Sequence, residues 1–174
     1  MREIDKNIEL VSEWTKGEAK KGNMCPLSED EIGEQLEKSH GVMLQSEDGE
    51  LIAYCRLLPW SDFLVEIGGT IVDSTPEKKR RRKGAGTEVT LLAIKKAGEL
   101  FPQAMIFGLT ENDKSEAMVR KMGGKKIDKS ELPNVVWDYC KRPGLECAHL
   151  KSFPDCPCVP FDFTHLKKKA SENK

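Results

Sequence analysis

The sequence predicts a mixed α and β fold of the α/β (α+β) class, and three observations carry this prediction. Apolar residues near the N-terminus recur at helical spacing, the apolar runs that follow are strand-like, and the second half of the chain switches between the two patterns. The predicted order of elements is α, α, β, β, β, α, β, α, β. A length of 174 residues suits one domain of ordinary size with at most a short appendage.

Two helices are predicted before the first strand. Apolar side chains three and four residues apart over residues 4–19 define one apolar helical face. They are Ile4, Ile8, Val11 and Trp14. Ser28 and Glu31 form a capping box, in which a hydroxyl at the cap is followed three residues later by a carboxylate, so we expect a second helix from there to about Ser39.

Three strands are predicted in the middle of the chain. Residues 42–44 and 51–58 are strand-like runs joined through an Asp-Gly pair at 48–49, which is a strong signal for the tight turn of a β-hairpin. A third apolar run over 63–72 is interrupted by a Gly-Gly pair at 68–69. Glycine inside a strand indicates a bulge or the close approach of another backbone.

The remaining elements follow in alternation. Residues 85–100 repeat apolar side chains at helical spacing until Phe101-Pro102 ends the pattern. Residues 104–109 predict a buried strand, and a short helix is predicted over 113–122. Residues 135–137 predict the last strand.

Composition and charge exclude several classes of protein. Hydrophobic residues make up 38% of the chain and charged residues 33%, with a mean hydropathy of −0.53, as in a polar globular protein. The 28 Lys and Arg residues balance 29 Asp and Glu residues, so we expect no general attraction to nucleic acid or anionic lipid. No segment approaches the roughly 20 apolar residues of a membrane span, and residues 1–20 lack a signal-peptide pattern. We therefore expect a cytoplasmic protein without membrane association.

Cysteine and proline gather in the last quarter of the chain, which predicts a body over residues 1–138 and a Cys/Pro-rich appendage with a basic tail over 139–174. Four of the six cysteines lie there, namely Cys140, Cys147, Cys156 and Cys158. These thiolates are candidate ligands for a structural zinc ion, with His149 or His165 as alternates. Their spacing is equally compatible with separate thiols or with oxidation of the Cys156 and Cys158 pair.

A basic segment with two glycines leads into the helix predicted over 85–100. Glycines at the start of a helix expose backbone N–H groups where the helix dipole adds positive charge, which is an arrangement that binds phosphate. Gly84 and Gly86 leave these amides accessible, and the charges at 81–83 can neutralise a diphosphate. Alone, the basic run would be read as a solvated face or an import-like string, but its position before Gly84 favours the pyrophosphate site.

Spacing distinguishes among the known phosphate motifs. No P-loop string occurs, and a dinucleotide fingerprint fails because Val89 stands where its third glycine would be. Residues 81–86 satisfy instead Arg/Gln-x-x-Gly-x-Gly/Ala, which resembles the coenzyme A pyrophosphate loop of the GCN5-related N-acetyltransferases (GNAT family). The resemblance extends downstream, since Asn112 follows a predicted strand and begins a helix that ends in Gly123.

The resemblance implies both a fold and an activity. The fold would be a mixed, mostly antiparallel central sheet flanked by helices, with splayed central strands forming the acetyl-CoA cleft. The activity would be transfer of an acetyl group from acetyl-CoA to a primary amine of an unidentified small molecule or peptide, by direct attack in a ternary complex. The implied cofactor contacts are Ile71, Val72, Arg81, Arg82, Lys83, Gly84, Ala85, Gly86, Thr87, Asn112 and Ser115.

The catalytic groups are less well defined than the cofactor loop. Glu66 stands where the family often has a base, with Glu111 and Asp62 as weaker candidates. The tyrosine that often protonates the departing thiolate falls at Val119, and we consider Tyr139 as its replacement. Gly124 stands where the family usually has an aromatic residue. A non-catalytic acyl-CoA sensor and a zinc-stabilised interaction module stay open as alternatives, as does a homodimer.

Overall fold

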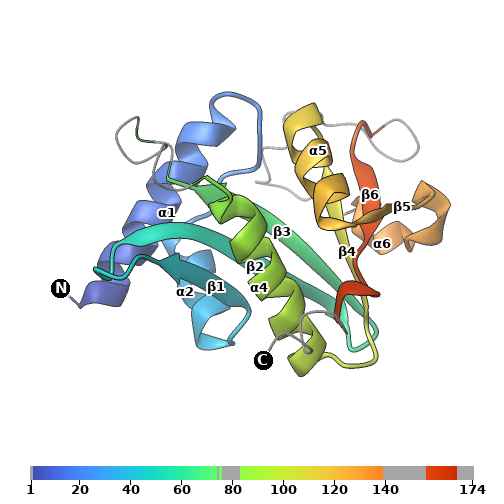
Figure 1. Ribbon diagram of the computed structural model, residues 1–174, viewed down its shortest axis with the longest axis horizontal. Helices are drawn as coiled ribbons and strands as arrows, with labels where there is room; N and C mark the ends of the chain where they lie inside the picture. The colour runs from blue at the N-terminus through green and yellow to red at the C-terminus, as the bar shows by residue number, and fades with distance from the viewer. Residues whose placement is uncertain (1, 74, 76–82, 139–155, 168–174) are drawn as a thin grey trace.

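The computed structural model of the chain describes residues 2–73, 75, 83–138 and 156–167 (Figure 1). The helices are α1 (Glu3–Ala19), α2 (Glu29–Glu37), α4 (Ala85–Leu100), α5 (Asp113–Met122) and α6 (Asn134–Asp138), with a 3-10 turn η1 (Lys129–Glu131). The strands are β1 (Gly41–Gln45), β2 (Leu51–Ser61), β3 (Leu64–Val72), β4 (Met105–Thr110), β5 (Lys125–Lys126) and β6 (Val159–Asp162).

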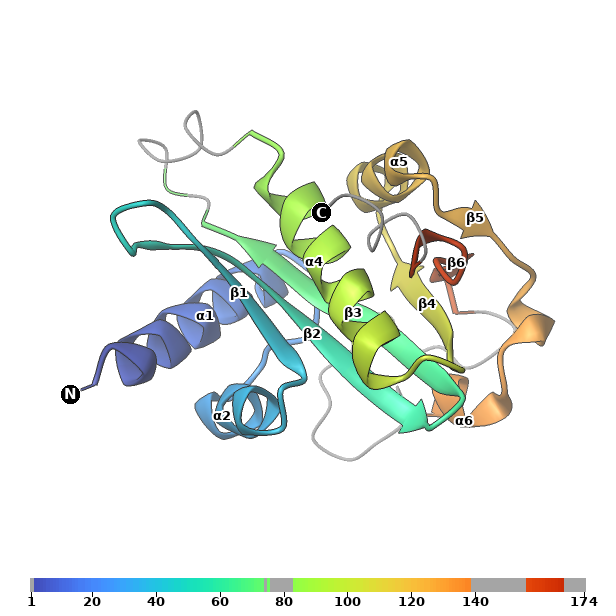
Figure 2. The same ribbon diagram turned by 60° about the horizontal axis from the view of Figure 1, so that its bottom comes forward.

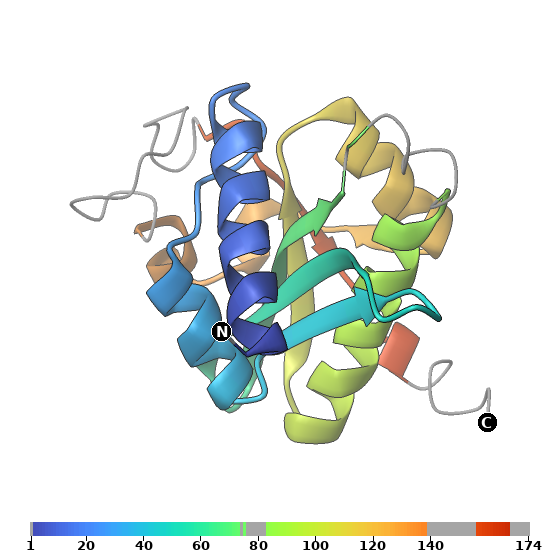
Figure 3. The ribbon, with the colours of Figure 1, turned by 90° about the vertical axis from the view of Figure 1, so that its left-hand side faces the viewer.

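One six-stranded sheet, in the order β1-β2-β3-β4-β6-β5, runs through the described chain. The β3 and β4 strands are parallel, and every other neighbouring pair is antiparallel. Helices cover both faces: α1 and α2 lie on one side, and α4 lies on the other (Figure 3). The predicted mixed, mostly antiparallel sheet flanked by helices is confirmed.

The main core lies between α4 and the sheet. Small and branched side chains of α4, such as Val89, Ala93 and Ile94, pack against alternate residues of β2 and β3. Because side chains alternate along a strand, Cys55 and Leu57 of β2 face this helix, whereas Tyr54 between them faces α1 and α2.

Two smaller cores lie on the opposite face of the sheet. The first, which we call the α1–α2 cluster, contains Val11, Leu27, Ile32, Leu51, Tyr54 and Ile71. The second, the α6 cluster, contains Leu64, Phe107, Leu132, Val136, Trp137, Cys156 and Cys158. The sheet face between these two clusters is therefore covered by neither apolar group.

The predicted N-terminal helices and the hairpin are confirmed. The Ser28 hydroxyl accepts the Glu31 amide at 3.2 Å, and the Glu31 carboxylate accepts the Ser28 amide at 2.8 Å, so the capping box is complete. The β1 and β2 strands pair in antiparallel register around a turn in which Gly49 has a φ of +80°.

The predicted last strand is wrong. Residues 135–137 belong to α6, where Val136 and Trp137 are both buried although they are adjacent. A strand would place adjacent side chains on opposite faces, whereas one helical turn directs both toward the α6 cluster. The last strand is β6, whose Phe161 is completely buried and which pairs with β4 and β5. This part of the predicted appendage thus belongs to the same sheet and core as the body.

None of the helices in the described ranges combines the length and the apolar character that crossing a membrane would require.

Candidate active site

The β3 and β4 strands separate after a short stretch of pairing. Residues 64–66 of β3 pair with residues 105–107 of β4, whereas β3 continues to Val72 and β4 to Thr110. Beyond this pairing, β3 is held only on its β2 edge and β4 only on its β6 edge in the part of the chain that the structure describes. The two strands therefore form a V-shaped split, visible in Figure 1. The predicted splayed central strands are confirmed.

A β-bulge bends β3 at the side of this split. The register of β2 and β3 shifts between the pairs Tyr54–Ile71 and Arg56–Gly68, which leaves one extra residue on β3. Gly69 has a φ of +57°, a conformation that glycine adopts without steric cost. The bulge predicted from the Gly-Gly pair is thus present.

After the bulge, the backbone of β3 directs one amide into the split. The Asp73 amide donates to the Ile52 carbonyl at 3.0 Å, so Asp73 faces β2. Since successive backbone amides of a strand face opposite edges, the Val72 amide faces the split. Its neighbour Ile71 pairs with Tyr54 and, like Asp73, faces β2 with its backbone, while its side chain is buried in the α1–α2 cluster. Ile71 therefore presents neither its amide nor its side chain to the split.

The N-terminus of α4 lies against the end of β3. A Cβ atom added at Gly86 would lie 3.4 Å from Val72 Cγ2 and 3.3 Å from Met118 Sδ of α5. Glycine at this position therefore lets α4 approach both neighbours closely. Figure 2 shows α4 over β2 and β3, with α5 beside β4.

The first turn of α4 has the features of an anion site. Gly84 is the N-cap residue with a φ of +97°, and an added Cβ would meet no atom within 4 Å. No side chain caps this helix among the described residues. The amides of Ala85, Gly86 and Thr87 thus lack intrahelical acceptors and lie at the positive end of the helix dipole. Lys83 is exposed beside them, whereas Arg81 and Arg82 lie outside the described residues.

A chain of hydroxyl and thiol groups ties this turn to the sheet. The Thr90 hydroxyl donates to the Gly86 carbonyl at 2.7 Å and lies 3.3 Å from the Thr70 hydroxyl. Thr70 in turn lies 3.2 Å from Cys55 Sγ of β2. Burial raises the pKa of Cys55 to about 11, so this thiol stays protonated and serves as a structural group.

Glu66 lies at the apex of the split, because its pair with Phe107 is the last one between β3 and β4. Its half-buried carboxylate accepts a hydrogen bond of 3.2 Å from the indole Nε1 of Trp60. Burial raises the pKa of Glu66, against the opposing effects of the Arg56 charge and the Trp60 hydrogen bond. A positioned carboxylate with raised proton affinity is suited to act as a general base. The weaker candidate Asp62 lies in the exposed turn between β2 and β3.

Residues of α5 frame the other side of the split. The Asn112 side chain caps the helix, its Oδ1 accepting the Ser115 amide at 2.9 Å. Val119 points away from the split and is buried in the main core. At this place the chain therefore has no hydroxyl that could protonate a leaving group.

The remaining candidates fall into two groups. Tyr139, Cys140 and Cys147 lie outside the described residues. Cys156 and Cys158 are buried in the α6 cluster, and within the described ranges no three His, Cys, Asp or Glu side chains are grouped as metal ligands. The structure thus gives no support to a zinc site.

Sequence reasoning missed Arg56, which extends from β2 across the bulge. A Cβ added at Gly69 would lie 3.3 Å from its Nε and 3.4 Å from its Cγ and Cδ. The available signal was an arginine within the otherwise apolar run of residues 51–58. That signal was weak, because only the β2–β3 register brings Arg56 to the glycine pair beside Glu66.

One relative of known sequence is similar to more than half of the chain. UPF0039 protein C11D3.02c of Schizosaccharomyces pombe (strain 972 / ATCC 24843) is 30% identical over 106 residues, which make up 61% of this chain and 68% of that protein. No family model matches the chain.

Solved structures share the fold at low sequence identity. N-acetylglutamate synthase from Neisseria gonorrhoeae, complexed with coenzyme A and N-acetyl-glutamate, has a TM-score of 0.66 and 16% identity over 90% of this chain. This chain spans only 32% of that enzyme. Rv2747 from Mycobacterium tuberculosis, in complex with CoA and NLQ, has a TM-score of 0.66 and 14% identity, covering 90% of this chain and 93% of that one.

Ard1 from Thermoplasma volcanium is similar over 91% of this chain and 89% of its own, with a TM-score of 0.57 and 14% identity. The separated β3 and β4 strands, the glycine-led α4 helix and the similarity to these solved structures all indicate the same fold. The chain belongs to the same family as the UPF0039 protein of Schizosaccharomyces pombe, and its fold is that of the GCN5-related N-acetyltransferases.

Proposed function

We propose that the chain transfers an acetyl group from acetyl-CoA to a primary amine by direct attack in a ternary complex. The observation that carries this proposal is the split between β3 and β4, which has a carboxylate at its apex and the uncapped first turn of α4 at its open end. Two of the similar solved structures, N-acetylglutamate synthase and Rv2747, are complexes with coenzyme A. This likeness supports the choice of thioester.

The open end of the split suits the diphosphate of coenzyme A. The amides at residues 84–87 would bind its oxygens, with positive charge from Lys83 and, by the sequence motif, from Arg81 and Arg82. The backbone of Val72 would bind the pantetheine arm along β3, and Asn112 and Ser115 would contact it from α5. Acetyl-CoA is here a substrate, and its binding needs no metal.

The chemistry needs three contributions. The acceptor amine must lose a proton, because an ammonium group with a pKa near 10.4 carries no lone pair, and Glu66 would take that proton directly or through water. The Val72 amide would donate to the carbonyl oxygen as negative charge develops there. As the carbon–nitrogen bond forms, the carbon–sulfur bond breaks and the sulfur leaves as thiolate. A thiol pKa of about 8.5 makes this departure feasible without a tyrosine at position 119.

The binding part of the proposal is tested by heat denaturation with coenzyme A. A ligand at about 100 times its dissociation constant should add about 2.7 kcal/mol to the free energy of unfolding. A folded protein whose melting temperature does not respond to coenzyme A would contradict the proposal.

The catalytic part is tested by thiol release from acetyl-CoA across a panel of amines, including amino acids, polyamines and peptides. We expect at least one amine to accelerate release above the rate without an acceptor. Binding of coenzyme A together with no acceleration by any amine would identify a non-catalytic acyl-CoA sensor instead.

A further inference from the structure

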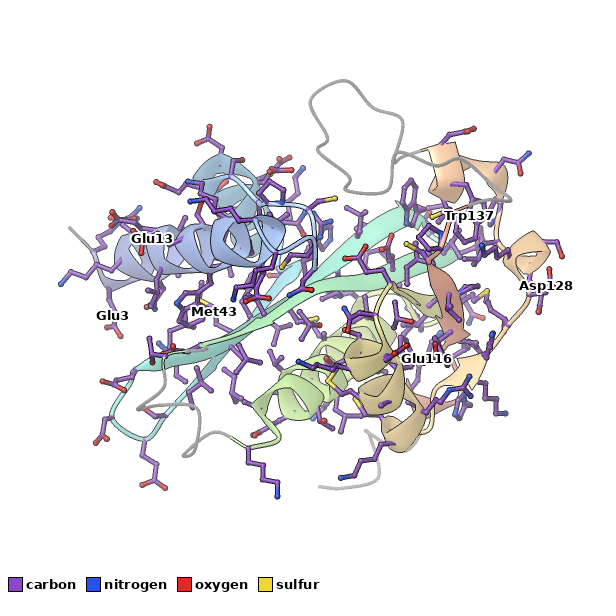
Figure 4. The ribbon with its side chains drawn as sticks, turned by 90° about the horizontal axis from the view of Figure 1, so that it is seen from above. Glu3, Glu13, Met43, Glu116, Asp128 and Trp137 are labelled. Atoms are coloured by element: carbon purple, nitrogen blue, oxygen red, sulfur yellow. The ribbon has the colours of Figure 1, made fainter. Side chains whose placement is uncertain are left out.

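A polar gap lies on the sheet face that carries α1, α2 and α6. The α1–α2 cluster covers Tyr54 and Ile71 at one end of this face, and the α6 cluster covers Leu64 at the other. Figure 4 shows α1 toward one end of the sheet and Trp137 of α6 toward the other. Two charged side chains, Arg56 and Glu66, occupy the strand positions between the clusters.

The register of β2 and β3 makes these two side chains diagonal neighbours. Arg56 pairs with Gly68, and Leu58 pairs with Glu66, so Arg56 and Glu66 are two positions apart on the same face. Diagonal neighbours on a sheet are typically about 7–8 Å apart, within reach of long side chains. Because Gly68 has no side chain opposite Arg56, the Glu66 side chain can occupy the space above it.

Both side chains bend over the glycine pair of β3. A Cβ added at Gly68 would lie 3.3 Å from Glu66 Oε1, and one added at Gly69 would lie 3.3 Å from Arg56 Nε. The Arg56 side chain therefore lies over the glycine pair of β3. Its charge acts on the Glu66 carboxylate, which lies beside it at the apex of the split.

The Nε–H group of Arg56 is a buried hydrogen-bond donor. It is enclosed by protein, and no described residue accepts its hydrogen bond. None of the ion pairs between described residues includes Arg56; they lie on α1, α2 and α5 and beside β6. A buried Nε–H donor is stabilised by a hydrogen-bond acceptor, and carboxylates match the planar donor geometry of arginine.

Glu66 is by contrast already oriented. Trp60 Nε1 donates to its Oε2 at 3.2 Å, which leaves Oε1 on the glycine side for a proton donor. The site thus offers a cation for an anionic group and, beside it, a carboxylate for an ammonium group.

We propose that the acceptor is an α-amino acid, whose carboxylate binds Arg56 while its amine lies at Glu66 beside the split. This inference rests on the proposed function, because it assigns the second substrate of the same site. Polyamines have no anionic group to satisfy Arg56, and the N-terminal amine of a peptide is followed by a neutral amide. A free amino acid carries its ammonium and its carboxylate on the same α-carbon, so one small molecule can meet both side chains.

The first test compares each amino acid with its carboxamide as acceptor for the unaltered protein. The two compounds have the same side chain and an α-amine at the same position. Because the amide also lowers the pKa of that amine, rates are compared per neutral amine, so that the remaining difference is the charge that would meet Arg56. Losing a hydrogen-bonded charge contact corresponds to about a 10- to 100-fold change in kcat/KM, and we expect a preference of this size for the acid. Equal rates with the acid and the amide would contradict the inference while leaving the transferase proposal intact.

The second test uses Arg56→Gln, which keeps a polar side chain as far as the position of Nε but is shorter than arginine and has no charge. We expect it to lose the preference for the acid by the same factor, with little change for the amide and none in coenzyme A affinity. Arg56→Lys should retain part of the preference, because a single ammonium replaces the planar group. An equal loss for acid and amide would show a structural role only and would overturn the assignment.

Arg120→Gln is the matched control, since Arg120 is an exposed arginine of α5 paired with Glu116 at 2.7 Å. We expect its acid-to-amide ratio to equal that of the unaltered protein. Calorimetry of amino acid binding to the protein saturated with coenzyme A supplies a readout without turnover. Binding of the amide as tightly as the acid in that experiment would also contradict the inference, whereas failure to bind coenzyme A would contradict only the proposed function.

Discussion

Glu66 combines a raised pKa with a place at the apex of the split, and this predicts the pH dependence of the reaction. Burial raises its pKa above the ordinary value of 4.5. Because the proposed base must be ionised, turnover should fall as the pH drops through this raised value. Glu66→Gln should lower kcat/KM by about 10²- to 10⁴-fold and remove this acidic limb, while coenzyme A affinity stays unchanged. The measurement is the pH–rate profile of both proteins.

The raised pKa of Glu66 also predicts how the free energy of unfolding depends on pH. This dependence runs in the opposite direction to that of turnover. A carboxyl group whose pKa is raised on folding contributes stability below its unfolded pKa and loses that contribution as the pH rises through the folded value. Glu66→Gln should therefore melt no lower than the unaltered protein at about pH 8, with an advantage that shrinks toward about pH 4. Glu116→Gln, on the exposed face of α5, serves as control. A pH–rate profile of Glu66→Gln identical to that of the parent protein would remove Glu66 from the mechanism.

At the residue scale, sequence alone could suggest Glu66 and the glycines at 84 and 86, but it could not suggest that Arg56 lies beside Glu66. Gly84 and Gly86 belong to a motif of six consecutive positions, so their meaning is local. Arg56 acquires its place only through the bulged register of β2 and β3, which depends on contacts between strands. Val119 illustrates the converse, because the family resemblance puts it where a tyrosine often stands, while its burial in the core could be seen only in the fold.

Among the elements, α4 depends most on close packing for its position. At Gly86 an added Cβ would already lie within 3.3–3.4 Å of Met118 and Val72, so the branches of a valine have no space there. Gly86→Val should cost about 1–3 kcal/mol of unfolding free energy and should weaken coenzyme A binding, since it moves the first turn of α4 away from β3. Chemical denaturation and a coenzyme A titration measure the two effects.

Gly17→Val provides the comparison for this element. In the interior of α1, a Cβ added at Gly17 would meet no other atom within 4 Å. The substitution introduces the same side chain into a helix, so the difference between the two variants isolates the effect of packing on the split. Unchanged coenzyme A affinity in Gly86→Val would show that the proposed phosphate turn tolerates displacement and would contradict its assigned role.

Elements with strong local signals were predictable, and those that depend on distant partners were not. The capping box at Ser28 and the Asp-Gly turn at 48–49 each act within four residues. The β6 strand carries a proline at position 160, which weakens a strand prediction, and it is stabilised by pairing with β4, some fifty residues earlier in the chain. The sequence pattern therefore predicts the last strand at residues 135–137, which have strand-like composition but form α6.

For the molecule as a whole, the segment 156–167 completes the sheet that contains the split. The Phe163 amide donates to the Ile106 carbonyl at 2.7 Å, and the Thr164 hydroxyl accepts the Ile106 amide at 3.0 Å. Pairing with β6 holds one edge of β4, so that its other edge is free to diverge from β3. The C-terminal segment thus supports the geometry of the proposed cleft from a distance.

Phe163 also leaves no room for a side chain at Gly124, where the family resemblance leads us to expect an aromatic residue. A Cβ added at Gly124 would lie 2.8 Å from Phe163 Cε1, and one added at Gly108 would lie 2.7 Å from its Cε2. The phenyl ring therefore lies directly against both glycines and fills the space that an aromatic residue at 124 would take. The aromatic contribution to the core comes here from a different part of the chain.

This arrangement predicts that Phe163→Ala is among the most destabilising single substitutions in the chain. Phe163 is only 2% exposed in the main core, and removal of a buried phenyl ring costs about 3–5 kcal/mol. Phe63→Ala removes the same ring from a side chain that is 70% exposed and should change the unfolding free energy by no more than about 0.5 kcal/mol. Urea denaturation of both variants measures the difference, and Phe163→Leu, with a smaller loss, keeps the comparison possible if Phe163→Ala does not fold. Equal midpoints for the Phe163 and Phe63 variants would show that the C-terminal segment does not pack against the sheet, and β4 would then lack the support that its divergence from β3 requires.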